Sequence, residues 1–286
     1  MSTATTIIAP STTVSAVLTH FSPPQDGSLP YTCVNESADR PRQNWVPQEH
    51  NVDIEDVRTN GTEKDYTLDK NGFQFYREAA KHTSFLTDEE VEKEYYPESI
   101  ELIKKLTGAR KVVLFDHTIR RRRPGELDTD VTKRQPVALV HVDQTPESAA
   151  NRVRRHLPAD EAEEILRSKS RFQILNLWRP IANPALDWPL ALCDYSTVDK
   201  KKDLVPVALI YPDREGQTFG VRFSENYRWK YAKGMTPEDV VLIKCYDSIE
   251  DGSVAQFTPH TAFQDPTTPE GAPLRQSIEL RALVFY

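Results

Sequence analysis

Cysteine is scarce in this chain of 286 residues, which has only Cys33, Cys193 and Cys245. The three lie far apart, their number is odd, and none belongs to a CxxC pair. These features argue against a disulfide framework and against a zinc ribbon. Cysteine usage of this kind is typical of a reducing compartment.

Basic residues are missing from the start of the chain, where the first Lys or Arg is Arg40. A secretory signal needs a positive start before a continuous apolar stretch, and a mitochondrial presequence needs arginines, so we expect neither. Long hydrophobic runs are also missing, because none approaches the roughly 18 apolar residues of a membrane span. We therefore expect a cytoplasmic protein with no membrane partner.

An excess of positive charge is missing as well, since the formal net charge is −7. A surface with this charge repels phosphate backbones on average, so we expect no nucleic-acid partner. The one basic run, from Arg120 to Arg123, is too short to change that expectation. It fits either a solvated strand end or loop, or a local contact to an anion or substrate.

The first half of the chain contains the predicted helices. Residues 1–70 are rich in Ser, Thr, Pro, Asn and Asp, and we expect an extended N-terminal arm with short strands there. Helices are predicted over 87–106, where Pro97 begins a second helix that Gly108 ends. A strand rich in β-branched and aromatic residues is predicted at 111–120.

The second half has the texture of a β protein. A strand over 136–144 leads into a helical section over 146–168, and the stretch 183–203 reads as loops. From residue 171 onward, short strand-like segments are separated by Pro, Gly, Asp and Asn. These segments are RFQILNLWRP, LVPVALIYP, QTFGVRFS, YRWKYAK, DVVLIKCYDS, FTPHTAF and RQSIELRALVFY. The pattern predicts one mainly β domain over 1–286, with flanking helices outside a barrel or sandwich core over 110–286.

The segment PVALVHVDQ brings two potential metal ligands close together. Side chains alternate between the faces of a strand, so His141 and Asp143 share one face with Val137 and Leu139. Neighbours on one face are about 6–7 Å apart, from a rise of roughly 3.3 Å per residue, so both side chains can reach one ion. HxD on a strand can therefore supply two ligands of a metal site.

His260, in the strand-like segment FTPHTAF, is the candidate for a third ligand. Two histidines and one carboxylate leave three adjacent positions of an octahedron open, which suits Fe(II) enzymes that bind O2. The motif alone is weak, because a His two residues before an Asp often arises by chance. Zinc hydrolases also use His and Asp ligands. A further sequence feature is needed to distinguish an iron oxygenase from a zinc hydrolase.

The C-terminal segment RQSIELRALVFY contains such a feature. Arg275 and Ser277 stand two residues apart and share one face of a strand. The guanidinium offers a rigid fork of donors to a carboxylate, and the hydroxyl adds another donor. Together they can hold the distal carboxylate of 2-oxoglutarate while its keto acid end chelates iron. An edge strand with a solvated polar face is the alternative.

The whole arrangement, with R-x-S fifteen residues after His260, resembles the Fe(II)/2-oxoglutarate dioxygenase superfamily. More narrowly, the chain resembles a fungal and bacterial group that includes gibberellin desaturase, the AsaB hydroxylase/desaturase and the cephalosporin 7α-hydroxylase component CmcJ. The segments that carry this likeness are LFDHTIRRR (114–122), PVALVHVDQTPESAANRVRRHL (136–157), FQILNLWRP (172–180), KCYDS (244–248), TPHTAF (258–263) and RQSIELRALVF (275–285). The resemblance implies a double-stranded β-helix (jelly-roll, cupin-like) core, and it implies Fe(II), 2-oxoglutarate and O2 as cofactor and cosubstrates.

The resemblance also implies roles for single residues. It gives the HxD pair and His260 as the iron ligands, and Arg275 with Ser277 as ligands of 2-oxoglutarate. Arg281 lies on the same polar strand face and is the alternative candidate for binding the distal carboxylate of 2-oxoglutarate. Six more residues either line the substrate pocket or are ordinary structural residues: His117, Arg120, Asn176, Trp178, Arg179 and Tyr246.

Three functions are compatible with these residues. The resemblance implies hydroxylation, desaturation or oxidative cyclisation at an unactivated C–H bond of a small molecule, in secondary metabolism. A second hypothesis is a non-catalytic jelly-roll subunit that works beside an enzyme. A third is a metal-dependent hydrolase or isomerase that uses the same triad.

Overall fold

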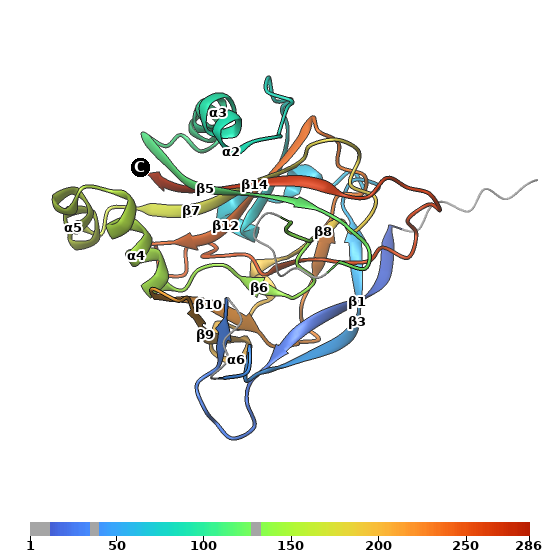
Figure 1. Ribbon diagram of the computed structural model, residues 1–286, viewed down its shortest axis with the longest axis horizontal. Helices are drawn as coiled ribbons and strands as arrows, with labels where there is room; N and C mark the ends of the chain where they lie inside the picture. The colour runs from blue at the N-terminus through green and yellow to red at the C-terminus, as the bar shows by residue number, and fades with distance from the viewer. Residues whose placement is uncertain (1–11, 35–39, 127–132) are drawn as a thin grey trace, which may run out of the picture.

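The computed structural model describes residues 12–34, 40–126 and 133–286, which form two β-sheets with flanking helices (Figure 1). Within these residues the larger sheet has nine strands and the smaller sheet has five. The expectation of a mainly β protein with flanking helices is confirmed.

The nine-stranded sheet is mixed. Its strands are, in spatial order, β1 (Thr13–Ser22), β3 (Val46–Asp56), β11 (Trp229–Tyr231), β8 (Leu190–Cys193), β13 (His260–Ala262), β6 (His141–Val142), β10 (Glu215–Val221), β9 (Leu204–Ile210) and β2 (Tyr31–Cys33). β3 pairs with β11, and β2 with β9, in parallel. The remaining neighbours in this order pair antiparallel.

The five-stranded sheet is antiparallel throughout its described strands. In spatial order these are β4 (Phe73–Arg77), β12 (Asp239–Asp247), β7 (Phe172–Pro180), β14 (Gln276–Phe285) and β5 (Lys111–Arg121). The central strand β7 is buried along its whole length. The protein therefore covers both faces of β7, and the polar side chains of this strand need partners within the protein.

Helices and short turns connect the strands. They are the 3-10 helices η1 (Glu63–Asp65) and η3 (Tyr195–Thr197), the π-helical turn η2 (Val91–Tyr95), and the α-helices α1 (Leu68–Asn71), α2 (Asp88–Glu90), α3 (Tyr96–Thr107), α4 (Pro146–His156), α5 (Ala159–Ser168) and α6 (Lys200–Asp203). None of the helices in the described ranges has the length and apolar character needed to cross a bilayer.

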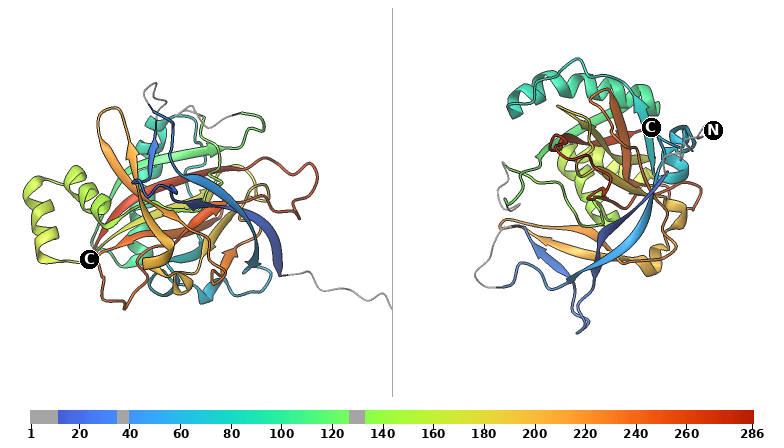
Figure 2. Two further views of the ribbon diagram at one scale, coloured as in Figure 1. Left: turned by 90° about the horizontal axis from the view of Figure 1, so that it is seen from below. Right: turned by 90° about the vertical axis from the view of Figure 1, so that its right-hand side faces the viewer.

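The two sheets lie as two layers. Figure 1 shows β5, β14 and β7 above β6 and β10, and the side view in Figure 2 shows the same separation. Helix α3 covers the outer face of the five-stranded sheet, where Ile103 packs in one core cluster with Leu280. Helices α4 and α5 close one end of the layers, where Val153 packs with Phe172.

Local sequence signals explain where α3 begins and ends. Pro97 lies in its first turn, where a missing backbone N–H costs no hydrogen bond. Gly108 follows its last residue with a φ of 74°, a left-handed conformation that glycine adopts without strain. The predicted end of this helix is confirmed. Its predicted separate start at Pro97 is wrong, because the helical backbone continues from α2 through η2 into α3.

The N-terminal segment contains longer strands than expected. β1 and β3 pair over ten residues. The N–H of Val140 donates to the carbonyl of Thr19 at 2.8 Å, so β1 lies beside the segment that leads into β6. Phe21 packs on Gly220, the strand partner of His141, where an added Cβ would lie 2.5 Å from the ring. Only glycine fits this close approach.

Two strand predictions differ from the structure. The strand expected over 136–144 is limited to His141–Val142, and β8 occupies Leu190–Cys193 in the stretch that reads as loops. β8 has only four residues, all buried, between Pro189 and Asp194. An apolar run of this length has no measurable period, so sequence pattern does not identify it as a strand.

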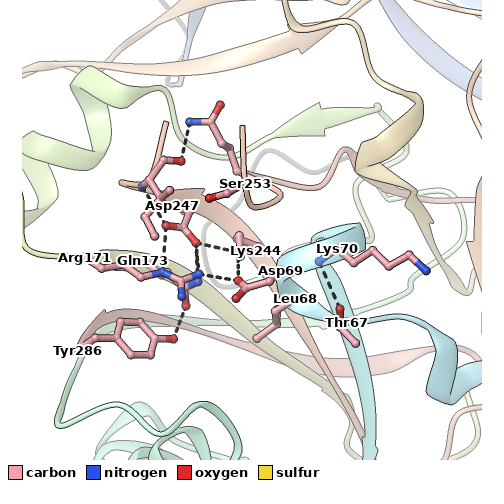
Figure 3. Close-up of polar contacts among 12 residues, drawn as sticks. Thr67, Leu68, Asp69, Lys70, Arg171, Gln173, Lys244, Asp247, Ser253 and Tyr286 are labelled. Atoms are coloured by element: carbon pink, nitrogen blue, oxygen red, sulfur yellow. Dashed lines mark hydrogen bonds and ion pairs between the residues drawn. The ribbon is translucent and has the colours of Figure 1, made fainter. Parts of the chain in front are cut away.

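A buried ionic cluster joins α1 to the five-stranded sheet (Figure 3). The ammonium of Lys244 lies 2.7 Å from Asp247 and 2.8 Å from Asp69. Arg171 lies 2.7 Å from the same Asp247 oxygen, and Gln173 donates to it at 2.7 Å. The side chains of Lys244 and Asp247 are completely buried, so their charges are compensated by ion pairs within the cluster and not by water.

Candidate metal centre

Three side chains converge between the two sheets. His141 in β6 and His260 in β13 are direct strand partners, and their ring centroids lie 4.4 Å apart. Asp143 follows β6, and the potential ligand atoms of all three residues lie within 4.8 Å of one another. Among the described residues, this is the only group of three such side chains able to hold one metal ion.

The backbone sets which nitrogen of each histidine faces the centre. Nδ1 of His141 lies 2.8 Å from the carbonyl oxygen of Leu139, and Nδ1 of His260 lies 3.0 Å from that of Thr258. A carbonyl oxygen only accepts, so each Nδ1 carries the proton in the neutral ring. Nε2 of each ring then presents a lone pair, which is the arrangement of a metal-binding histidine.

Asp143 is held by neighbours from the opposite sheet. Asn176 of β7 donates to Oδ2 of Asp143 at 2.7 Å, and the Cys245 thiol of β12 lies 3.4 Å from the same oxygen. The other oxygen, Oδ1, lies 3.3 Å from Nε2 of His141. One carboxylate oxygen is therefore fixed by the protein and the other faces the two imidazoles.

Opposite charges shift the protonation of the three groups. Although burial opposes it, the contact with His141 and the charge of His260 hold the pKa of Asp143 well below its usual range. Asp143 in turn raises the pKa of His141 against the effect of burial. Burial and the charge of His141 lower the pKa of His260. The site thus favours an ionised carboxylate and a neutral His260, which is the donor set that fits Fe(II) with three positions left open.

Arg275 and Ser277 are buried with unsatisfied donors. Arg275 is 2 % exposed and Ser277 is 1 % exposed. Nε of Arg275 and the hydroxyl of Ser277 make no hydrogen bond within the described part of the chain, although Nη1 of Arg275 donates to the carbonyl of Trp188. Burial and the nearby charge of Arg120 lower the pKa of Arg275 to about 9. A buried cation without a carboxylate partner is costly, so this pair is suited to a bound anion.

Comparison with known proteins identifies the family. A family described as an oxidoreductase/YMDC permease-like domain matches residues 18–285. The hydroxylase/desaturase efuI of Hormonema carpetanum is 34% identical to this chain, and the match covers 96% of each protein. The Fe(II)/2-oxoglutarate-dependent dioxygenase nvfI of Aspergillus novofumigatus is also 34% identical, over 85% of this chain and 84% of that protein. The chain belongs to the Fe(II)/2-oxoglutarate-dependent dioxygenase family.

A solved structure of the same family has the same fold. The iron and alpha-ketoglutarate-dependent endoperoxidase NvfI superposes with a TM-score of 0.81 and 29% identity, over 96% of this chain and 98% of that one. The jelly-roll expectation and the expected enzyme class are confirmed. Members of this dioxygenase family use Fe(II), 2-oxoglutarate and O2, and the His–Asp–His group is a donor set of the matching kind.

The dioxygenase fold places Arg281 differently from Arg275. Nε of Arg281 donates to the carboxylate of Asp116 at 2.5 Å. Against the effect of burial, the charges of Asp116 and Asp143 raise the pKa of Arg281. Arg281 is the strand partner of Asn176, so it lies beside the residue that holds Asp143. Its charge is already neutralised within the protein.

The structure brings only some of the remaining predicted residues toward this centre. Arg120 is the strand partner of Ser277, and it donates to the carbonyl of Gln135 at 2.9 Å. Trp178 lies under Arg275, whose guanidinium carbon is 5.4 Å from the ring centroid. Both therefore lie on the side of the sheet that faces the triad, as does Asn176.

Three other predicted residues are not brought to the triad. His117 lies on the outer face of β5, where Nδ1 is 2.9 Å from the hydroxyl of Tyr96 in α3. Arg179 also points outward, with its guanidinium carbon 5.8 Å from the ring centroid of Tyr95. Tyr246 packs in the core cluster beneath α4 and α5. In His117 and Arg179, strand alternation has turned the side chain to the helix-covered face.

Three residues near this site were not identified from the sequence. Glu279 stands between Ser277 and Arg281 on one strand face, and its charge influences both metal-site histidines. The two-residue period of β14 would have been enough to predict that Glu279 shares this face. Cys245 gives no motif signal. Trp188 has a φ of 48°, which is strained for a bulky residue, and its carbonyl binds Arg275. It lies in a loop, where no period exists to predict its position.

Proposed function

We propose that His141, Asp143 and His260 bind Fe(II), and that the enzyme oxidises an unactivated C–H bond of a small organic molecule. The observation that carries this proposal is the meeting of two unprotonated Nε2 atoms and one carboxylate oxygen within 4.8 Å. Two neutral imidazoles and one carboxylate leave a net charge of about +1 on a bound Fe(II), which attracts an anionic cosubstrate.

We further propose that Arg275 and Ser277 bind the distal carboxylate of 2-oxoglutarate. Both are buried, and each keeps a donor that has no partner among the residues described. Arg281 is the weaker candidate because Asp116 already accepts from its Nε. Arg120 is the strand partner of Ser277 and adds positive charge beside Arg275. Two guanidiniums on one side of the sheet favour a carboxylate there.

Iron bound at the triad supplies O2 activation and hydrogen-atom removal, coupled to oxidative decarboxylation of 2-oxoglutarate. The protein's own residues orient the reactants. Asn176 fixes one oxygen of Asp143, and Trp178 forms an apolar wall beside Arg275. Such positioning places one C–H bond of the substrate near the iron and keeps water away. Hydroxylation, desaturation and oxidative cyclisation all fit this arrangement, and secondary metabolism fits the family likeness.

Several proposals concern the chain as a whole. We place residues 1–286 in one oxygenase domain, with an N-terminal arm over 1–70 and a jelly-roll core over 110–286. Pairing of β1 with β3 in the same sheet as the triad supports a single domain. We also place the enzyme in the reducing cytoplasm, with no membrane or nucleic-acid partner. Its three cysteines are buried free thiols, which supports a reducing compartment.

O2-dependent release of succinate from 2-oxoglutarate by the purified protein tests the proposed function. We expect release with added Fe(II), and we expect His141→Ala to reduce it to background because two remaining ligands do not retain the metal. His117→Ala is the matched control, since His117 contacts α3 on the outer face, and it should keep wild-type release. A non-catalytic subunit, or a hydrolase on the same triad, would release no succinate.

A further inference from the structure

A cavity lies away from the metal centre, on the outer face of the five-stranded sheet. It has a volume of about 690 Å³ and is bounded by the segment after β4 and by η2 and α3. Arg179 of β7 lines it, as do Tyr95 and Ser99 of the helical segment. A cavity of this size accommodates a small organic molecule.

Three buried polar groups that line this cavity make no hydrogen bond with the described residues. They are Nε of Arg179 and the hydroxyls of Tyr95 and Ser99, whereas Nε2 of His82 lies 3.9 Å from a carboxylate oxygen of Glu90. Arg179 is 2 % exposed, and Tyr95 and Ser99 are 1 % exposed. Burial raises the pKa of Tyr95, and the charge of Arg179 and the hydroxyl of Ser99 oppose that rise, so the three groups lie close together. Few buried polar groups in native proteins lack a partner, and three such groups around one cavity point to a ligand.

Arg179 is the one buried cation of this cavity, and no carboxylate of the described residues pairs with it. Its Nη1 donates to the carbonyl of Pro237 at 2.9 Å, which satisfies part of the guanidinium but leaves its charge uncompensated. The nearby carboxylates are engaged elsewhere. Glu98 accepts from the backbone N–H groups of Lys81 and His82, and Glu78 pairs with Lys105 at 2.9 Å.

The charge and shape of the cavity favour one class of ligand. A single buried guanidinium compensates one negative charge, and the surrounding glutamates repel a more highly charged anion such as phosphate. Ala79, Ala80 and Leu102 give the cavity apolar walls that can contact an organic body. We propose that this cavity binds a small organic monocarboxylate, with its carboxylate on Arg179 and the hydroxyls of Tyr95 and Ser99.

The site is distinct from the metal centre because strand alternation separates them. Asn176 and Trp178 of β7 face the triad and Arg275, whereas Arg179 faces α3. The two sites therefore lie on opposite faces of one sheet and use different arginines. A substitution can therefore disrupt one binding site and leave the other intact.

Equilibrium dialysis of the full-length protein against labelled benzoate tests the proposal. We expect the wild type and Arg275→Gln to retain benzoate, because Arg275 belongs to the other face. Arg179→Gln should weaken retention at least about tenfold, through loss of a charge-assisted hydrogen bond. The matched control Arg77→Gln changes an exposed arginine of β4, which β12 separates from β7 in the same sheet, and should retain benzoate fully.

A second variant tests the same site in case Arg179→Gln does not fold. Ser99→Ala removes one hydroxyl from a helix, where alanine is well tolerated, and should weaken benzoate retention about threefold. No retention by the wild type up to about 10 mM benzoate, a weak affinity even for a small ligand, would overturn the proposal. So would equal retention by Arg179→Gln and Ser99→Ala, or retention of labelled phosphate in place of benzoate. Loss of benzoate in Arg275→Gln alone would assign it to the metal centre.

Discussion

Asp143 is the only anionic donor of the triad, and its two oxygens have different tasks. Asn176 donates to one of them at 2.7 Å, and the other faces His141 at 3.3 Å. A hydrogen bond to a ligating carboxylate fixes its orientation and keeps the correct oxygen toward the metal. Asn176 is thus a positioning residue in our proposal, because it acts on iron through Asp143.

Removal of that hydrogen bond should weaken iron binding and leave the fold intact. We expect Asn176→Ala to lower Fe(II) affinity about 10- to 100-fold, the usual range for outer-shell partners of metal ligands. Anaerobic titration with Fe(II) measures the effect. Asn226→Ala is a matched control, since Asn226 is exposed and its side chain makes no hydrogen bond with the described residues. Equal affinities for the two variants would contradict the role of Asn176.

Iron affinity should also depend on pH in a defined direction. Metal binding requires neutral imidazoles, and Asp143 raises the pKa of His141 above its ordinary value of 6.5. Below that raised pKa, protons compete with the metal, so Fe(II) affinity should fall about tenfold for each pH unit. Titrations at pH 8 and pH 6 check this. An affinity that stays constant, or rises at the lower pH, would show that His141 is not a ligand.

Single residues differ in how well the sequence predicts them. The HxD pair and Arg275 with Ser277 are local patterns, because side chains two apart on a strand share a face. His117 and Arg179 also belong to strands, but the sequence does not say which face the helices cover. Cys245 meets Asp143 only through the packing of the two sheets. Contacts between distant elements leave no local signal.

At the scale of elements, the paired strands β1 and β3 bury a histidine that has no hydrogen-bond partner among the described residues. His20 of β1 is completely buried, its ring centroid lies 5.3 Å from that of Phe223, and neither ring nitrogen is bonded. Burial and the charge of His50 lower the pKa of His20 from 6.5 to about 4. The neutral imidazole behaves here as an aromatic core residue.

This histidine should make stability fall with pH in a limited window. The unfolded chain takes up a proton near pH 6.5 and the folded chain only near pH 4, so stability is lost as pH falls between these values. We expect a loss of about 1–2 kcal/mol between pH 7 and pH 5 in urea unfolding. His20→Phe, which cannot take up a proton, should lack that part of the loss. The same pH slope in both proteins would disprove this origin.

The ionic cluster of Figure 3 joins three elements and should be important for stability. Asp247→Asn removes the charge that Lys244 and Arg171 share. Breaking a buried ion pair on one side leaves an uncompensated charge, so we expect a loss of about 3 kcal/mol in unfolding free energy. Glu163→Gln breaks the exposed pair with Arg154 and should cost at most about 1 kcal/mol. Similar losses would show that the cluster is solvated.

Elements with regular patterns were predicted closely, and short ones were not. Strand β14 and helix α3 follow clear periods and end signals, and both lie where they were expected. β6 contains only His141–Val142, although a longer strand was expected. Pairing with a neighbour decides how far such a strand extends, and that pairing belongs to the tertiary structure.

At the scale of the whole molecule, the metal centre depends on the stacking of two sheets. The nine-stranded sheet provides His141 and His260, and the five-stranded sheet provides Asn176, which holds Asp143. The sequence predicted a β core with helices outside, but not which strands make up each sheet. Strands far apart in the chain are neighbours, as β3 and β11 show, and no local pattern specifies such pairs.

The central claim is that three side chains hold the iron and Arg275 holds 2-oxoglutarate beside it. Anaerobic titration with Fe(II) and 2-oxoglutarate, followed by visible absorption, tests it most directly, because the charge-transfer band requires both to be bound together. We expect the band in the wild type, none in Asp143→Ala, and a requirement for at least about tenfold more 2-oxoglutarate in Arg275→Gln. A band of wild-type intensity in Asp143→Ala would contradict the claim.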